Sequence, residues 1–410
     1  MARRRTLLRR GSELLLGAEG AVAGESEAQA MTLSSALLAT GVVLLSPLML
    51  DLAHLFEVSP SRVGLLVTAY TAPPIVLIPL IGVVADRTGR KPLLVAGLVL
   101  FGLAGAATGV VRDFEVALAF RFLQGVGFAA AMPLTITVLG DVYTGSREAT
   151  VQGLRTAGNF FTNMVGPVVA AVLLGISWQF PFALFLLTLP VAAWVWTSLP
   201  ATAPESGTSL RRYVRDLGAL VRRPHMSLIL LSFGLRFVVF YGFLTYVSFL
   251  GKETIGLSTV AVGLATAVKA VASVVGSTQA GRITLRGHTA LVAGAALGLM
   301  GLGMTLAGLA PGVLTLGIGS VLLGLGDGLV APVQKSLVTN LAPGSLRAGA
   351  ISASSTVQNA GKAIVPVAMS GVLVTAGPPA VFVVLGVVGL VGAVTLVPVW
   401  RLTRDVDALT

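Results

Sequence analysis

Long apolar segments recur along the whole chain, and they limit its fold more than any other feature of the sequence. Apolar residues make up 55% of the chain and charged residues 11%, whereas soluble domains carry about 25% charged residues. Twelve segments are each about long enough to cross a bilayer as a helix, and we predict that all twelve do. They cover residues 32–50, 62–82, 92–111, 117–139, 150–174, 179–199, 226–250, 258–280, 289–310, 313–337, 349–374 and 379–400. This pattern excludes a soluble protein and predicts an all-α integral membrane fold.

Basic residues are distributed unevenly between the loops that join these segments. If the N-terminus is cytoplasmic, most arginines and lysines of the loops lie on the cytoplasmic side, and the outer loops hold only Arg62, Arg112 and Lys252. Cytoplasmic loops of membrane proteins are enriched in lysine and arginine. We therefore expect a multi-pass protein of the plasma membrane with both termini in the cytoplasm. The net charge of +11 then reports topology, and we expect a bilayer and no nucleic acid as partner.

A polar stretch at residues 200–225, rich in proline and arginine, divides the twelve segments into two sets of six. The two sets align at an offset of 199 residues, which superposes several glycines and prolines. The superposed pairs are Gly82 and Gly281, Gly125 and Gly324, Gly127 and Gly326, Pro133 and Pro332, and Pro167 and Pro366. Internal repeats of this kind are common in transporters. We predict two pseudo-symmetric six-helix bundles that arose by internal duplication.

The domain division follows from this alignment. We predict a cytoplasmic tail at 1–31, an N-terminal bundle at 32–199, a cytoplasmic linker at 200–225, a C-terminal bundle at 226–402 and a second cytoplasmic tail at 403–410. Residues 1–30 combine arginines with short apolar runs that Glu13 and Glu19 interrupt. We interpret them either as an amphipathic tail on the membrane surface or as a segment upstream of a start at Met31.

Three local motifs carry further information. Residues 82–91 read Gly-x-x-x-Asp-Arg-x-Gly-Arg-Lys between two apolar segments, and their glycines permit a tight reversal and close helix approach. Residues 121–127 read Arg-x-x-Gln-Gly-x-Gly inside an apolar segment, and Gly158 precedes a Gly166-Pro167 pair in the next one. Together with the twelve segments, these motifs resemble the major facilitator superfamily, most closely its twelve-helix drug:proton antiporters. The third motif departs from the family pattern because Val168–Ala171 replace its final glycines.

The resemblance implies a role for the charged loop in gating the cytoplasmic side. Asp86 can accept hydrogen bonds at a helix N-terminus, and the resemblance implies that it docks the N-terminal bundle against segment 349–374 in the outward-open state. Arg90 is expected to pair with Asp141. The predicted gating residues are Gly82, Asp86, Arg87, Gly89, Arg90, Lys91 and Asp141.

Five charged residues lie near the middle of predicted spans: Arg121, Arg236, Lys269, Asp327 and Lys362. A charge at the bilayer centre costs about 2.5–3.5 kcal/mol on insertion scales, so five facing lipid would cost about 10–15 kcal/mol. They must face a cavity or one another. Each also has a purely structural interpretation, because Arg121 can bind backbone carbonyls, the lysines can extend toward the membrane surface, and Asp327 can serve only as an ion-pair partner.

We assign these residues to two roles. Arg121, by its motif, and Asp327, as the one mid-membrane acid, are predicted to couple transport to protons. The remaining cavity candidates are Arg236, Phe240, Lys269, Asn159, Asn163, Gln358, Asn359 and Lys362. Four bases against one acid favour an anionic or carboxylate-bearing substrate by Coulomb attraction.

The sequence predicts a secondary active transporter that exports small amphipathic or drug-like molecules, driven by the proton gradient. The alternative is an importer or exchanger of organic anions, and a remote alternative is a non-transporting membrane sensor or scaffold. The chain has no cysteine and no phosphate-binding loop, so thiolate metal sites and an ATP-driven mechanism are unsupported. We expect no enzymatic activity, no cofactor, no metal site and a monomer.

Overall fold

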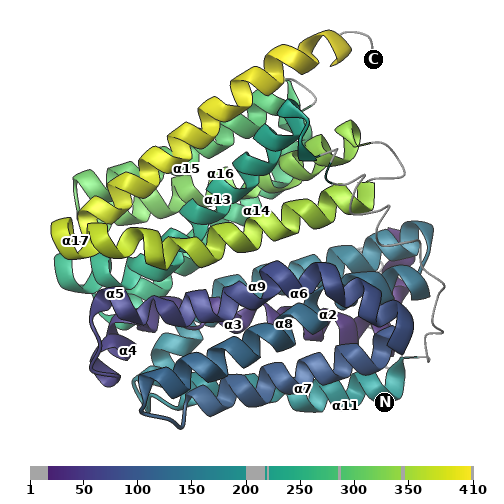
Figure 1. Cartoon of the computed structure of the whole chain (residues 1–410), viewed down its shortest axis with the longest axis horizontal. Helices are drawn as coiled ribbons and strands as arrows, with labels where there is room; N and C mark the ends of the chain where they lie inside the picture. The colour runs from purple at the N-terminus through teal and green to yellow at the C-terminus, as the bar shows by residue number, and fades with distance from the viewer. Residues whose placement is uncertain (1–16, 200–217, 219–220, 285–287, 343–346, 408–410) are drawn as a thin grey trace.

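The computed structural model describes residues 17–199, 218, 221–284, 288–342 and 347–407, and they form helices nearly throughout (Figure 1). Within these residues, eleven helices are long and apolar enough to cross a membrane. The longest, α17 (Arg347–Asp407), contains a non-helical residue, Gly377, with φ 75° and ψ 178°. Two prolines follow it, and proline cannot continue the backbone ladder of a helix. Helix α17 therefore folds back on itself and covers the last two of the twelve predicted spans.

The N-terminal half contains the following elements in chain order: η1 (Gly17–Gly24), α2 (Ser26–Leu38), α3 (Thr40–Val43), η2 (Ser46–Leu48), α4 (Met49–Leu55), α5 (Pro60–Val63), α6 (Leu65–Thr88), α7 (Arg90–Thr108), α8 (Phe114–Val142), α9 (Gly145–Leu174), α10 (Phe180–Ala183), η3 (Leu184–Leu187) and α11 (Thr188–Ser198). The first span begins earlier than the predicted residue 32 and is broken into three helices. Its second break coincides with Pro47, which lies in η2.

The C-terminal half contains α13 (Pro224–Phe249), the π-helical turn η4 (Leu250–Thr254), α14 (Thr259–Thr284), α15 (Thr289–Leu309), α16 (Val313–Leu341) and α17. Figure 1 shows the two halves as two separate groups of helices, coloured from purple through blue to teal for the first and from teal through green to yellow for the second. Helices α7, α11 and α15 pack within their own half. Their sequences carry no charge in their central portions, which suits a lipid-facing position.

The internal repeat is visible in the closest helix contacts. A Cβ added at Gly125 would lie 2.2 Å from the backbone oxygen of Tyr70, and one added at Gly324 would lie 2.2 Å from that of Lys269. Both pairs are related by the offset of 199 residues that aligns the two halves of the sequence. The same helix crossing, which only glycine permits, is thus built twice.

The halves meet through a second pair of related contacts. A Cβ added at Gly64 would lie 2.8 Å from Cβ of Pro366, and one added at Gly263 would lie 3.0 Å from the backbone oxygen of Pro167. These glycines and prolines are again related by the offset of 199 residues, and each contact joins one half to the other. Helix α6 therefore packs on α17, and α9 packs on α14, as a pseudo-two-fold axis requires.

Polar contacts between the halves gather at one end of the molecule. Ser248 Oγ donates to the backbone oxygen of Pro47 at 3.0 Å, and Lys252 Nζ binds Asp51 Oδ1 at 2.5 Å. Thr259 Oγ1 accepts from Lys252 at 2.9 Å and contacts Asp51 Oδ2 at 3.4 Å. We call these five residues the end cluster. It lies near α4 and α5, on the left in Figure 1, and fastens the halves together there.

Candidate functional site

The buried arginine of the N-terminal half, Arg121, is bound entirely by neutral groups. Its side chain is fully buried in α8. Its guanidinium donates to the backbone oxygens of Leu66 at 3.2 Å and Gly41 at 2.7 Å, and to Gln124 Oε1 at 2.5 Å. The ring of Tyr70 lies 4.5 Å from its central carbon. Arg121 therefore joins three helices, and one of its acceptors lies in α3, next to the break in the first span.

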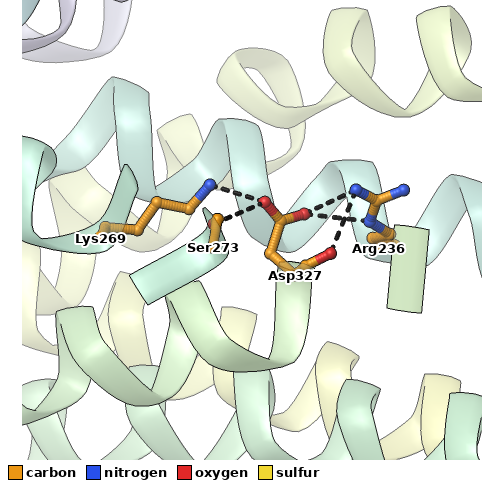
Figure 2. Close-up of polar contacts among 4 residues, drawn as sticks. All are labelled: Arg236, Lys269, Ser273 and Asp327. Atoms are coloured by element: carbon orange, nitrogen blue, oxygen red, sulfur yellow. Dashed lines mark hydrogen bonds and ion pairs between the residues drawn. The ribbon is translucent and has the colours of Figure 1, made fainter. Parts of the chain in front are cut away.

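The mid-membrane acid, Asp327 in α16, is shared by two cations of the C-terminal half. Arg236 Nη2 and Nε lie 2.7 and 3.0 Å from Oδ1. Lys269 Nζ and Ser273 Oγ lie 2.7 and 3.2 Å from Oδ2. Figure 2 shows Arg236 approaching the carboxylate from one side, and Lys269 and Ser273 from the other. Asp327, Lys269 and Arg236 are only 6%, 5% and 9% exposed, so the group is a buried cluster with one negative and two positive charges.

Aromatic rings of α13 separate these cations from the next one. Lys269 Nζ lies 3.6 Å from the ring centre of Phe240, and the Arg236 guanidinium lies 4.9 Å from that of Phe237. The two rings contact each other and that of Tyr241, with centroids 5.4 to 6.2 Å apart. Aromatic faces attract cations, so the rings stabilise charges that the membrane interior disfavours.

Lys362 in α17 lies on the other side of these rings. Its Nζ is 5.0 Å from the ring centre of Phe237 and 5.2 Å from that of Tyr241. It donates to Asn359 Oδ1 at 3.1 Å. No acidic group among the described residues forms an ion pair with it. Its side chain is half-buried.

A small cavity lies beside Asp327 and is lined by both halves. The N-terminal half contributes Val43, Phe160 and Asn163, and the C-terminal half contributes Phe240, Leu244, Thr266, Lys269, Ala270, Ser273 and Asp327. Its volume is about 40 Å³, which is room for about three water molecules, whereas drug-sized ligands occupy clefts of about 300–1,000 Å³. In this conformation a drug-sized molecule does not fit, so binding requires the two halves to separate.

The structure thus brings together four of the eight predicted cavity residues. Phe240, Lys269 and Asn163 line the cavity with Asp327, and Arg236 binds that carboxylate. Asn159 instead accepts a hydrogen bond from Ser35 at 3.0 Å, within the N-terminal half. Arg121 belongs to the same half and binds there rather than to Asp327. Gln358 is half-buried in α17 beside Asn359, and no hydrogen bond to it is described.

The predicted gate lies at the end of the molecule opposite the end cluster. Arg90 pairs with Asp141, as expected from the motif. Gly89 adopts φ 87°, a conformation that favours glycine, and ends α6. Lys91 donates to the backbone oxygen of Leu199 at 2.6 Å. These contacts lie within the N-terminal half; the side chains of Asp86 and Arg87, and the surroundings of Gly82, lie outside the described residues.

Sequence reasoning missed several participants. Ser273 and Phe237 touch the charged cluster, but serine and phenylalanine are common in membrane helices and gave no signal. The ion pair between Asp51 and Lys252 could have been predicted from the sequence. Both are isolated charges at the ends of the first spans of the two halves, and such residues meet when the halves are related by pseudo-symmetry.

Comparisons with known proteins agree with this architecture. The family model described as "Major Facilitator Superfamily" matches residues 31–287 and 252–409. The chain is 32% identical over 149 residues to the "Bacillibactin exporter" of Bacillus subtilis (strain 168), covering 35% of this chain and 37% of that one. It is 28% identical over 169 residues to "Multidrug transporter MdfA" of Yersinia pestis bv. Antiqua (strain Angola), covering 41% of each. The matches thus span about two fifths of these relatives' lengths.

A solved structure shares the whole fold. It is a "Bacterial Homolog to Human Lysosomal Transporter, Spinster", with a TM-score of 0.72 at 16% identity. The match covers 91% of this chain and 96% of that one. This similarity places both halves, in the same arrangement, within a known transporter fold.

Proposed function

Because this chain belongs to the Major Facilitator Superfamily, we propose that it exports small amphipathic molecules by alternating access between its two halves, driven by protons. That it is a multi-pass membrane transporter of small molecules, and not an enzyme, follows from the family. The direction, the driving ion and the roles of individual residues are the proposal.

The orientation in the membrane comes from the basic residues. At the end opposite the end cluster, the described helix ends carry Arg90, Lys91, Arg147, Arg222, Arg223, Arg282 and Arg401, so we assign this end to the cytoplasm by the positive-inside rule. The end cluster then closes the outer side. With the ion pair of Asp51 and Lys252 in place, the halves open toward the cytoplasm when they separate. The gating residues at positions 82–91, with Asp141, close that side in the opposite state.

One observation carries the coupling role: a single carboxylate, Asp327, lies buried beside a cavity lined by both halves and is shared by two cations. When the halves separate, the water molecules and charged groups that surround the carboxylate of Asp327 change. A proton binds the carboxylate when the ion pairs loosen, and leaves when they form again. Arg121 positions the broken first span, whose α3 lines the same cavity, and thereby links substrate occupancy to this rearrangement.

Export is supported by relatives. The relatives that match this chain include multidrug transporters and a bacillibactin exporter. Import or exchange of organic anions is the second candidate, which the excess of cations over acids among Arg236, Lys269, Asp327 and Lys362 favours. A non-transporting sensor is the remote one.

The test uses purified protein in liposomes with an imposed pH gradient and an internal pH dye. Lipophilic cations and organic anions are added to wild type, to Asp327→Asn and to Arg222→Gln, which alters an exposed arginine outside the spans. We expect substrate-triggered proton flux in wild type and Arg222→Gln and none in Asp327→Asn. Flux that persists in Asp327→Asn removes Asp327 as the carrier, and no flux with any compound refutes proton coupling.

A further inference from the structure

Among the described residues, Lys362 is the mid-membrane cation of the C-terminal half that forms no ion pair. We propose that Lys362, held between Phe237 and Tyr241, is the anchor for an anionic group on the substrate, and that the substrate class is an aromatic or apolar molecule carrying a carboxylate. This inference rests on the proposed transport function and specifies its substrate.

The charge balance of the C-terminal half requires an anion. Asp327 forms ion pairs with both Arg236 and Lys269. Those three side chains together retain one positive charge, and Lys362 adds a second. No other acidic residue of the described structure lies in this cluster or in the lining of the cavity. A buried region with two excess positive charges and low-dielectric surroundings attracts anions and repels cations.

The contacts of Lys362 leave it able to bind a ligand. An ammonium group has three N–H donors, and one of them is used by Asn359 Oδ1 at 3.1 Å. The neighbouring rings of Phe237 and Tyr241 supply only their faces, at 5.0 and 5.2 Å. Two donors therefore remain for the oxygens of a carboxylate. The rings beside them offer an apolar surface on which the body of such a molecule can pack.

The internal repeat shows that the fold itself does not need this cation. Lys362 lies four residues before Pro366, and the equivalent position before Pro167 is Asn163. Both prolines make the same contact with a glycine of the other half. In the same alignment, Lys269 and Asp327 replace Tyr70 and Phe128, whose rings stack at 5.5 Å. The N-terminal half builds the same helix crossings without these charges, so their presence in one half points to the ligand.

The experiment measures binding of one matched pair of probes, 2-naphthoate and 2-naphthamide, which share ring and shape and differ in charge. Binding is measured by equilibrium dialysis on purified full-length protein in detergent. The variants are Lys362→Gln, Lys362→Arg, which keeps the charge, and the exposed control Arg222→Gln. A hydrogen-bonded charge contributes about tenfold to hundredfold in affinity.

We expect wild type to bind 2-naphthoate at least about tenfold more tightly than 2-naphthamide, as one charged hydrogen bond predicts. Lys362→Gln is expected to bind the two equally, whereas Lys362→Arg and Arg222→Gln keep the preference. Equal binding of the two probes by wild type overturns the inference without any variant. A preference that survives in Lys362→Gln overturns it too, and retained 2-naphthamide binding shows that the variant is folded.

These outcomes are independent of those for transport. If the liposome assay detects no transport but the carboxylate preference depends on Lys362, the transport function fails and the anion site stands. If cations drive proton flux and 2-naphthoate shows no preference, the site fails and the transport function stands.

Discussion

Replacing Asp327 by asparagine tests the ionic character of the buried cluster through protein stability. The substitution removes the negative charge that Arg236 and Lys269 share at 2.7 Å each and keeps only one of the two acceptor oxygens. It leaves two cations that are 9% and 5% exposed without a counter-charge. Removing one partner of a buried ion pair costs about 3–5 kcal/mol. At about 2–4 °C per kcal/mol for a unit of this size, Asp327→Asn is expected to lower the Tm by about 10 °C.

The matched variant is Lys269→Met, which leaves Asp327 paired with Arg236 as a neutral unit of similar packing. Replacing a buried ion by an apolar side chain is often close to neutral, so its Tm is expected to change by less than about 3 °C. The double variant removes one of the two orphaned cations and is expected to be more stable than Asp327→Asn alone. Tm is measured from tryptophan fluorescence of purified protein during heating. Equal Tm values for the two single variants, or a double variant less stable than either, would refute the ionic cluster.

Three further predictions concern other parts of the molecule. Lys252→Gln removes a partly exposed ion pair of about 0.5–1 kcal/mol and is expected to raise the outward-open population about two- to fivefold. Spin labels at Ser59→Cys and Ser258→Cys, in a chain without other cysteines, measure the distance between the halves. The control Arg62→Gln, which loses an ion pair within one half, should leave that distance unchanged. Gly125→Ala places a Cβ 2.2 Å from a backbone oxygen of the neighbouring helix and is expected to lower the free energy of unfolding by about 3 kcal/mol or more. Gly153→Ala, with open space around it, should not destabilise the protein. Equal yields of folded protein for the two variants would contradict the geometry of this helix crossing. Arg121→Lys cannot reach all three acceptors of the guanidinium fork and is expected to lose about 2 kcal/mol or more; an unchanged Tm would mean that these contacts are dispensable.

Much of the fold could be predicted from the sequence, because a bilayer imposes strong rules on apolar length and on the sides of basic loops. The offset of 199 residues also has direct physical content, since a Cβ added at any of the superposed glycines Gly125, Gly127, Gly324 and Gly326 would lie within 2.7 Å of the backbone of a neighbouring helix. The breaks in the first span were not predicted. Helices tolerate such breaks only where tertiary contacts satisfy the freed groups, and here the carbonyl of Gly41 is satisfied by Arg121, which lies 80 residues away.

The sequence predicts which residues belong to the candidate site, but it does not predict which of them contact one another. The cost of a charge in the membrane identifies Asp327, Arg236 and Lys269 as residues that must face inward, and the pairing of Arg90 with Asp141 followed from the motif. Which cation binds which acid depends on helix rotations that no sequence pattern specifies. Pairing Asp327 with two cations leaves Lys362, within the described part of the C-terminal half, as the mid-membrane cation without an acid, and that distinction needed coordinates.

The reversal of α17 at Gly377 has a mechanical consequence. A single residue joins two limbs, of which the first packs against α6 of the opposite half through Ala363 and Pro366. The second limb packs against α15 and exposes Val387, Val391 and Val394, a surface that suits contact with acyl chains. Because the turn is one residue long, the two limbs cannot tilt independently. A thicker or thinner bilayer changes the tilt of the second limb, and this change then also moves the first limb, which forms the contact between the halves. The acyl composition of the surrounding membrane is thereby expected to set how readily the transporter opens.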